Sequence, residues 1–199
     1  MQANSSVEVD TDPSADRVRR VDARRNLEAI VDAAIPLLTE RPRASMQQIA
    51  SAAGLHRATV HRHFPSRDDL LDELRQRAID ATVAELAAVM DNPSDDPGDT
   101  LERATAALIG VGDRFRLYRF TTWRSPAAEE TAGVVGEGLM KLLADAQAAG
   151  QVRTDLPIEQ VGIAFGGLIV AMMPPVGEGS LTATEAARTV RTLLAAPQV

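Results

Sequence analysis

Residues 45–67 hold two short amphipathic segments joined at a glycine, and this stretch constrains the fold more tightly than any other. Ser45 followed by Gln48 is the capping-box pattern of a helix start. Apolar side chains recur at helical spacing over the next two turns. Gly54 follows, and glycine most readily takes the left-handed conformation found after a helix end. The pattern predicts a short helix that ends in a tight turn.

The segment after this turn, residues 56–64, carries polar and basic side chains around an apolar seam of Val60 and Phe64, and Pro65 ends it. Two short helices joined by a tight turn form the helix-turn-helix motif, whose second helix enters the major groove of DNA. The same pattern also occurs in all-α proteins that bind no DNA, so the surrounding charge has to distinguish the two interpretations.

Basic charge is confined to the part of the chain that holds this motif. The whole chain has a net charge of −7, but residues 17–67 contain ten arginines against four acidic residues, a net +6. Residues 1–16 carry −4 and residues 68–199 carry −9. A confined basic region is the electrostatic footprint of phosphate binding, whereas an acidic remainder favours solubility. Chance segregation of charge is the alternative.

Residues 1–16 are acidic and polar, which is typical of a disordered tail, and they contain no apolar run that would indicate a signal peptide. Five arginines follow and run into the first predicted helix: Arg17, Arg19, Arg20, Arg24 and Arg25. A basic arm ahead of a helix-turn-helix can lie along phosphates or in the minor groove, so we expect this cluster to contact DNA. A solvated helix start is the alternative.

Apolar side chains at three- and four-residue spacing predict helices along the whole chain and no strand. The expected fold is all-α with about nine helices, at residues 22–39, 45–53, 56–64, 66–90, 99–111, 113–122, 126–149, 155–173 and 180–195. Pro36 is expected to kink or shorten the first helix. Gly110 and Gly112 are expected to end the fifth, and Asp155 to cap the eighth.

Three parts follow from this layout: a disordered acidic tail (1–16), a helix-turn-helix DNA-binding domain (17–66) and a ligand-binding and dimerisation domain (67–199). The long helix that opens at Ser66 runs from the basic part into the acidic part without a break. A continuous helix is a physical connection through which one domain can affect the other.

Residues 160–177 contain no charged side chain, which raises the possibility of a membrane span. A membrane span needs about 20 consecutive apolar residues. The case for a span here is weakened by two pairs of residues, Gly166-Gly167 and Pro174-Pro175. A fully buried helix is the prediction instead. Because a helix that is apolar all round must be covered on all sides, we expect a second subunit to cover part of it.

The order of elements and the residues of the motif resemble the TetR family of bacterial transcriptional regulators. The resemblance covers residues 24–74 and rests on Ile49-Ala50, Ala53-Gly54-Leu55, Thr59, Arg62-His63-Phe64, Ser66-Arg67 and Leu70. Beyond about residue 90 only the helix layout matches. The resemblance implies an all-α homodimer that binds a double-stranded DNA operator, with a small-molecule effector in its C-terminal domain.

DNA contacts are expected from the first helix, the start of the second and the recognition helix: Arg24, Ser45, Arg57, Ala58, Thr59, His61, Arg62, His63 and Arg67. The resemblance implies that Thr59 and Arg67 hold phosphate and that His63 is partly structural. His61 departs from the family, which usually has a tyrosine there. A protonated histidine adds positive charge, so we hypothesise that acidic pH strengthens DNA binding through His61.

An apolar ligand pocket is expected from aromatic and methionine side chains of the C-terminal part: Tyr118, Trp123, Met140, Phe165 and Met172. Core packing is the alternative for most of them. The three histidines lie between residues 56 and 63 at spacings that suit a metal poorly, and the chain has no cysteine. We therefore expect no metal site, no cofactor and no enzyme activity.

The dimer interface is expected on the last two helices, at Ile163, Gly166, Gly167, Val170, Val190 and Leu194. The sequence thus predicts a cytoplasmic, ligand-responsive transcriptional regulator, most simply a repressor released from a palindromic operator by a small, largely apolar ligand. Two alternatives remain: a constitutive DNA-binding protein without an effector, and an enzyme or carrier that uses the helical cavity.

Overall fold

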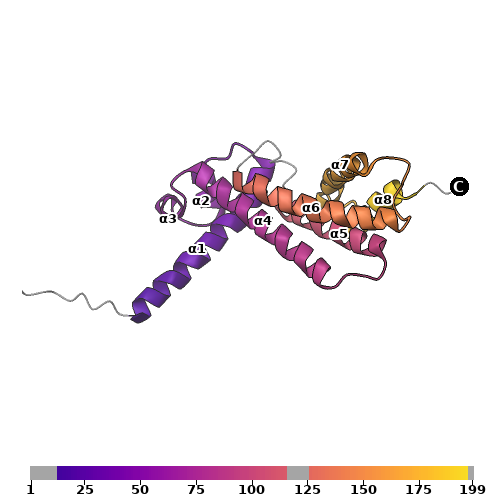
Figure 1. Cartoon of the computed structure of the whole chain (residues 1–199). Helices are drawn as coiled ribbons and strands as arrows, with labels where there is room; N and C mark the ends of the chain where they lie inside the picture. The colour runs from indigo at the N-terminus through magenta and orange to yellow at the C-terminus, as the bar shows by residue number, and fades with distance from the viewer. Residues whose placement is uncertain (1–12, 116–125, 197–199) are drawn as a thin grey trace, which may run out of the picture. The chain divides into compact units, whose positions relative to one another are not determined.

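The computed structural model describes residues 13–115 and 126–196, and the regular elements within these ranges are all helices (Figure 1). They are α1 (Pro13–Glu40), α2 (Met46–Ala52), α3 (Arg57–His63), α4 (Arg67–Asp91), α5 (Pro97–Phe115), α6 (Pro126–Ala148), α7 (Ile158–Gly177) and α8 (Ala183–Leu194). The all-α prediction is confirmed, with eight helices in the described ranges where nine were expected. The packing divides the chain into two compact units, Met1–Leu70 and Leu71–Val199.

The N-terminal unit is built where the second half of α1 packs against α2 and α3. Its fully buried side chains lie along one stripe of α1, on the two short helices and at the start of α4: Ile30, Ala34, Leu38, Ile49, Ala50, Val60 and Leu70. The three-four spacing of the first three residues places them on one face, as the sequence predicts. This core fixes the orientation of α3, whose opposite face is exposed.

Helix α1 differs from its predicted form at both ends. It begins at Pro13, so residues 13–16, assigned to the disordered tail, are helical. Pro36 was expected to kink or shorten the helix, yet α1 continues past it to Glu40. A proline here removes one hydrogen bond near the end of a helix that is already held by its buried stripe.

The C-terminal unit has α5 at its centre, in contact with α6, α7 and α8 (Figure 1). Its core joins Val89 at the end of α4 to side chains of the other four helices, including Ile109, Leu143, Phe165 and Val190. Tyr118 and Trp123 lie outside the described residues, as does most of the predicted helix 113–122.

The prediction that Gly110 and Gly112 end a helix is wrong, because α5 runs through both to Phe115. Packing provides the reason at Gly112, where a Cβ atom would lie 2.6 Å from Met173 Sδ. A second close approach joins Gly162 of α7 to Met140 of α6, with 2.5 Å from a built Cβ to Sδ. These glycines make room for methionine side chains instead of breaking helices.

Three features of α7 also differ from expectation. Asp155 does not cap it: the residue before the helix is Pro157, and the Asp155 carboxylate accepts hydrogen bonds from Arg153, Nε at 2.8 Å and Nη2 at 2.7 Å. The helix continues beyond Met173, through two prolines, to Gly177. It is also not buried on all sides, since only one face enters the core.

Candidate nucleic-acid interface

The turn between α2 and α3 is fixed by hydrogen bonds at both ends of α2. Ser45 N donates to Gln48 Oε1 at 2.8 Å, and Gln48 N donates to Ser45 Oγ at 3.3 Å, which completes the predicted capping box. At the other end Gly54 has a φ of +67°, its N–H donates to the Ser51 carbonyl, and Leu55 N donates to the Ala50 carbonyl. This pair of bonds is a Schellman motif, which requires the left-handed residue that glycine provides.

Helix α3 presents a continuous polar face. Val60 is fully buried, whereas the side chains of Arg57, Ala58, His61 and Arg62 are exposed. At about 100° per residue these four span roughly 140° of the helix circumference. Thr59 and His63 lie half-buried at the edges. An exposed basic face on a short helix held from behind by an apolar core is the geometry of a recognition helix.

The environment of His63, at the end of α3, shifts its titration. Burial, followed by the nearby charge of Arg62, lowers the pKa of His63 below its ordinary value. Its Nε2 atom is buried and has no hydrogen-bond partner. Burial and the charge of Arg62 thus both favour the neutral form of the ring.

Arg67 lies at the first residue of α4 and closes the motif from the other side. Its Nη2 donates a 2.6 Å hydrogen bond to the carbonyl oxygen of Pro42, in the loop before α2. Ser66 caps the same helix, with Ser66 N to Asp69 Oδ2 at 2.8 Å and Asp69 N to Ser66 Oγ at 3.1 Å. The capping pattern was predictable, but no sequence signal indicates the bond across 25 residues.

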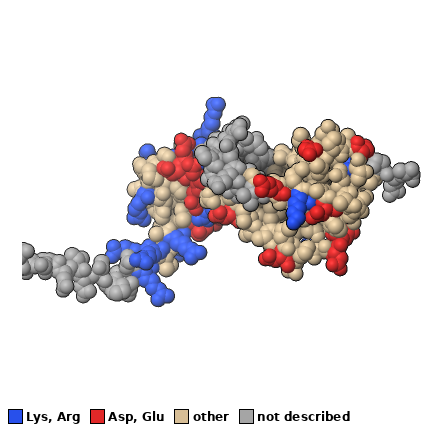
Figure 2. Space-filling model, viewed as in Figure 1, with Lys and Arg blue, Asp and Glu red and all other residues tan. Residues whose placement is uncertain are grey.

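Positive charge gathers on the N-terminal unit, as Figure 2 shows along the N-terminal part of α1 and around the two short helices. Nine of its arginines have exposed side chains: Arg17, Arg19, Arg20, Arg24, Arg25, Arg41, Arg43, Arg57 and Arg62. Arg41 and Arg43 flank Pro42 and were not among the predicted DNA contacts. Arg41 and Arg43 lie next to the residue that Arg67 binds, so they belong to the same basic surface.

The predicted DNA-binding residues thus fall into three places. The α3 face carries Arg57, Ala58, Thr59, His61 and Arg62, with His63 at its edge. Ser45 caps α2 and Arg67 starts α4. Arg24 lies on the exposed first half of α1. All three places belong to one compact unit.

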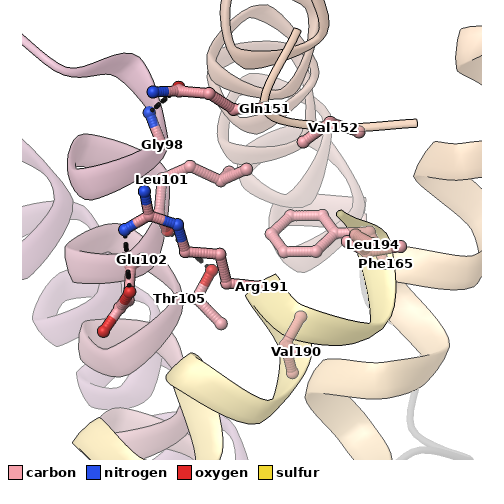
Figure 3. Close-up of a pocket in the computed structure, with 10 residues that line it drawn as sticks. All are labelled: Gly98, Leu101, Glu102, Thr105, Gln151, Val152, Phe165, Val190, Arg191 and Leu194. Carbon is pink, nitrogen blue, oxygen red and sulfur yellow. Dashed lines mark hydrogen bonds and ion pairs between the residues drawn. The ribbon is translucent and has the colours of Figure 1, made fainter. Parts of the chain in front are cut away.

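The residues predicted to line a ligand pocket do not share one cavity. Phe165 lines a cavity of about 10 Å³ between α5, α7 and α8, which is too small for more than a water molecule (Figure 3). Met140 packs over Gly162, and Met172 is half-buried at the edge of the core. The other two predicted residues lie outside the described ranges.

One end of this small cavity is closed by a polar network (Figure 3). Arg191 Nη1 donates to Asp99 Oδ1 at 2.5 Å and to Glu102 Oε2 at 3.1 Å, and these hydrogen bonds raise the pKa of Arg191. Gln151 Oε1 accepts from Gly98 N at 2.6 Å. Gln151 Nε2 donates to Asp96 Oδ1 at 2.5 Å, which is the main cause of the lowered pKa of Asp96. The network ties α8 to the start of α5.

The predicted dimer residues separate into two groups. Val190 and Leu194 are buried, at 1% and 3% exposure, inside the core of their own unit. The prediction that they form the interface is wrong, because helical spacing identifies an apolar face without indicating what covers it. On α7, in contrast, Ile163 is 78% exposed and Val170 45%, with Gly166 and Gly167 also exposed.

Residues 13–115 and 126–196 can also be examined for a metal site and for a membrane-spanning helix. No group of three or more histidine, aspartate or glutamate side chains in these ranges could hold a metal ion. By length and composition alone, α7 could cross a membrane, a test that core helices of globular domains also pass.

Comparison with known proteins agrees with this geometry. Residues 30–74 match the family model of bacterial regulatory proteins, tetR family. The HTH-type transcriptional repressor LfrR of Mycolicibacterium smegmatis is 37% identical over 103 residues, 51% of this chain and 52% of LfrR. The chain spans about half the length of the curated relatives it matches.

Solved structures extend the likeness over most of the chain. The crystal structure of the TetR-like regulator LfrR from Mycobacterium smegmatis in complex with proflavine has a TM-score of 0.68 at 27% identity, covering 88% of this chain and 96% of that one. The structure of AibR in complex with isovaleryl coenzyme A and operator DNA has a TM-score of 0.70 at 18% identity, covering 87% and 100%, which shows the fold alone. The helix-turn-helix unit of this chain thus matches the TetR family of bacterial transcriptional regulators by sequence, and most of the chain shares the fold of TetR-like regulators.

Proposed function

We propose that this chain is a cytoplasmic, ligand-responsive transcriptional repressor that binds a palindromic DNA operator as a homodimer. The observation that carries the proposal is the exposed basic face of α3, held by a buried Val60 and flanked by further exposed arginines of the same unit. Such a surface suits the major groove and the phosphates on either side of it.

Specific contacts are assigned to α3 and nonspecific ones to the arginines around it. Arg57, Ala58 and His61 lie on the face that can reach base edges, and Arg62 extends it. An arginine forms paired hydrogen bonds with guanine and an alanine contacts the thymine methyl group. Arg67 uses one nitrogen for Pro42, and a guanidinium has five N–H donors, so it can hold a phosphate as well.

The dimer is assigned to α7. Its exposed face combines Ile163 and Val170 with Gly166 and Gly167, which allow another helix to approach closely. An apolar helix face left in water is unfavourable, and a second copy of the same face would bury it symmetrically. On α8, Leu193 can contribute to this dimer interface because it is exposed, whereas Val190 and Leu194 are buried.

A small, largely apolar effector is assigned to the C-terminal unit. LfrR, which resembles this chain over most of its length, binds proflavine in its crystal structure. In the present chain, Met140 and Met173 fill the space over two glycines, and flexible methionine side chains can repack around a ligand. Effector and DNA would weaken each other's binding by the same factor, as linkage requires.

The test begins with a duplex selected from a random DNA pool by the purified protein. We expect binding that depends on sequence and weakens steeply with salt, and a variant with Arg57→Ala and His61→Ala that loses sequence preference. A thermal-shift screen then identifies compounds that stabilise the protein, each of which is added to the DNA complex. Release of DNA supports the repressor.

The two alternatives give different results. DNA binding that no stabilising compound affects indicates a constitutive DNA-binding protein. Failure to bind any duplex at low salt contradicts the proposed function and leaves an enzyme or carrier.

A further inference from the structure

Residues 41–44 form a closed turn that joins α1 to α2. Ala44 N donates a 2.9 Å hydrogen bond to the carbonyl oxygen of Arg41. Pro42 occupies the second position of the turn, which its fixed φ favours. Ala44, the last residue of the turn, is only 3% exposed, and Arg67 Nη2 binds the Pro42 carbonyl oxygen at 2.6 Å. The backbone of the turn is therefore fixed by the proline ring, by a buried end and by a bond to α4.

The turn carries two exposed arginine side chains. Arg41 and Arg43 line an open hollow in the surface together with Gln48, which is also exposed. Within the described residues, neither arginine side chain forms a hydrogen bond or an ion pair. Gln48 Oε1 accepts from Ser45 N, and the amide nitrogen of Gln48 donates to no other described residue. Three side chains that line the hollow thus offer N–H donors, which is the requirement for binding an anion.

Three acidic residues lie near this turn in the sequence. Glu40 ends α1 directly before the turn, and Asp68 and Asp69 follow Arg67. Asp69 Oδ2 accepts hydrogen bonds from Ser66, from N at 2.8 Å and from Oγ at 2.7 Å. Within residues 13–115 and 126–196, none of the three carboxylates forms an ion pair with Arg67 or with the arginines of the turn. The two arginines of the turn therefore remain available to an anion from outside the chain.

We propose that the turn of residues 41–44 is a preformed phosphate-binding site of the N-terminal unit. Arg41, Arg43 and the Gln48 amide bind phosphate oxygens of the DNA backbone. Arg67 is a positioning residue, which holds the turn through the Pro42 carbonyl. The proposal rests on the DNA-binding function proposed above and adds a second contact to it.

The position of the turn explains what a phosphate contact here would do. The turn leads directly into α2, which packs against α3, so turn and recognition helix belong to one core. A phosphate bound by the turn would fix the register of α3 on the duplex without reading a base pair. Because the turn is already ordered, little conformational freedom is lost when it binds.

The first test compares two variants that lose the same charge in different places. In one, Arg41 and Arg43 become glutamine. In the control, Arg103 and Arg188 of the C-terminal unit become glutamine; their side chains are exposed as well. Affinity for the duplex selected by the wild-type protein is measured by fluorescence anisotropy between about 50 and 200 mM KCl, where phosphate contacts dominate the salt dependence.

We expect the slope of log K against log salt to fall by about 1 to 2 in the turn variant, at about 0.9 per lost phosphate contact. The control should keep the wild-type slope, and both variants should keep the sequence preference. Equal slopes for the turn variant and wild type overturn the proposal. Absence of DNA binding by wild type would instead contradict the proposed function itself.

A neutral methylphosphonate, placed at one phosphate of the duplex at a time, locates the contact. Where the turn binds, this replacement should weaken binding by wild type and have a smaller effect on the variant that lacks Arg41 and Arg43. A scan in which no phosphate distinguishes the two proteins would contradict the site.

Two further variants test whether the turn has to be held in place. Pro42→Gly keeps every arginine and the carbonyl that Arg67 binds, but frees φ in the turn. We expect its affinity to fall about two- to fivefold with an unchanged salt slope. Arg67→Leu should weaken DNA binding less in the variant that lacks Arg41 and Arg43 than in wild type. Full affinity of Pro42→Gly would overturn the preformed site, and additive losses would overturn the positioning role of Arg67.

Discussion

Arg67 Nη2 lies 2.6 Å from the carbonyl oxygen of Pro42, so the start of α4 is joined to the loop that precedes α2. Arg67→Leu removes this bond and should lower the free energy of unfolding by about 1 kcal/mol, the usual size for a partly exposed charged hydrogen bond. It should also reduce the salt dependence of DNA binding. Arg43→Leu, at an exposed neighbouring arginine, is the control for lost charge. Identical urea midpoints for the two variants would count against the structural role of Arg67.

Replacing Gly54 by alanine should lower the free energy of unfolding, whereas replacing Gly110 by alanine should raise it. A Cβ atom would meet nothing within 4 Å at either position, so sterics with neighbours do not contribute. Gly54 has a φ of +67°, where alanine costs about 1–2 kcal/mol. Gly110 lies inside α5, where alanine gains about 0.5–1 kcal/mol. Urea unfolding measures both, and a stabilised Gly54→Ala protein would contradict the turn geometry.

Stability should decline on mild acidification because of His63. Its pKa is lowered by burial and by Arg62, so the unfolded chain binds the proton more readily than the folded one. The contribution of neutral His63 to the free energy of unfolding is therefore fully present above about pH 6.5, the ordinary pKa of histidine. It is lost as the pH falls below that value. We expect His63→Gln to lose less stability than wild type between pH 7.5 and 5.5. His56→Gln, at an exposed histidine, should follow wild type; equal losses in all three proteins would exclude the effect.

Ile163→Asp should separate the dimer without unfolding the subunit. The side chain is 78% exposed in the single chain, so the fold does not depend on it. A carboxylate closed into an apolar interface costs at least about 2 kcal/mol, which raises the dimer Kd roughly 30-fold or more. Sedimentation velocity at micromolar concentration measures the change, with Val83→Asp on α4, 45% exposed, as control. A monomeric wild type would rule out the assigned interface.

Arg191→Met should destabilise the C-terminal unit by about 1–3 kcal/mol, because Asp99 and Glu102 lose a shared donor. Arg188→Met is the matched variant: its side chain is 67% exposed and lies 3.8 Å from Glu102. A pair of this kind contributes about 0–1 kcal/mol. Thermal unfolding should therefore separate the two variants, and equal melting temperatures would contradict the importance of the network.

Local signals in the sequence predicted local structure well. The capping box of Ser45 and Gln48, the turn at Gly54 and the cap at Ser66 each depend on residues within five positions of one another. Their hydrogen bonds close within about one helical turn, so the residues that form them can be read directly from the sequence.

Predictions failed where distant packing decides. Gly112 was expected to end a helix, but Met173 occupies the space that a side chain would fill. Val190 was assigned to a dimer surface, but its own core covers it. The bond from Arg67 to Pro42 had no sequence signal at all. Periodicity indicates which face is apolar, and only the tertiary structure shows what covers that face.

The close approach of Gly112 and Met173 couples the two positions during evolution. A side chain at 112 would displace the flexible end of the Met173 side chain, so the methionine must repack or be replaced by a smaller residue. A smaller residue at 173 alone leaves a cavity, which is destabilising. In diverging descendants of this chain, a larger residue at 112 should therefore accompany a change at 173.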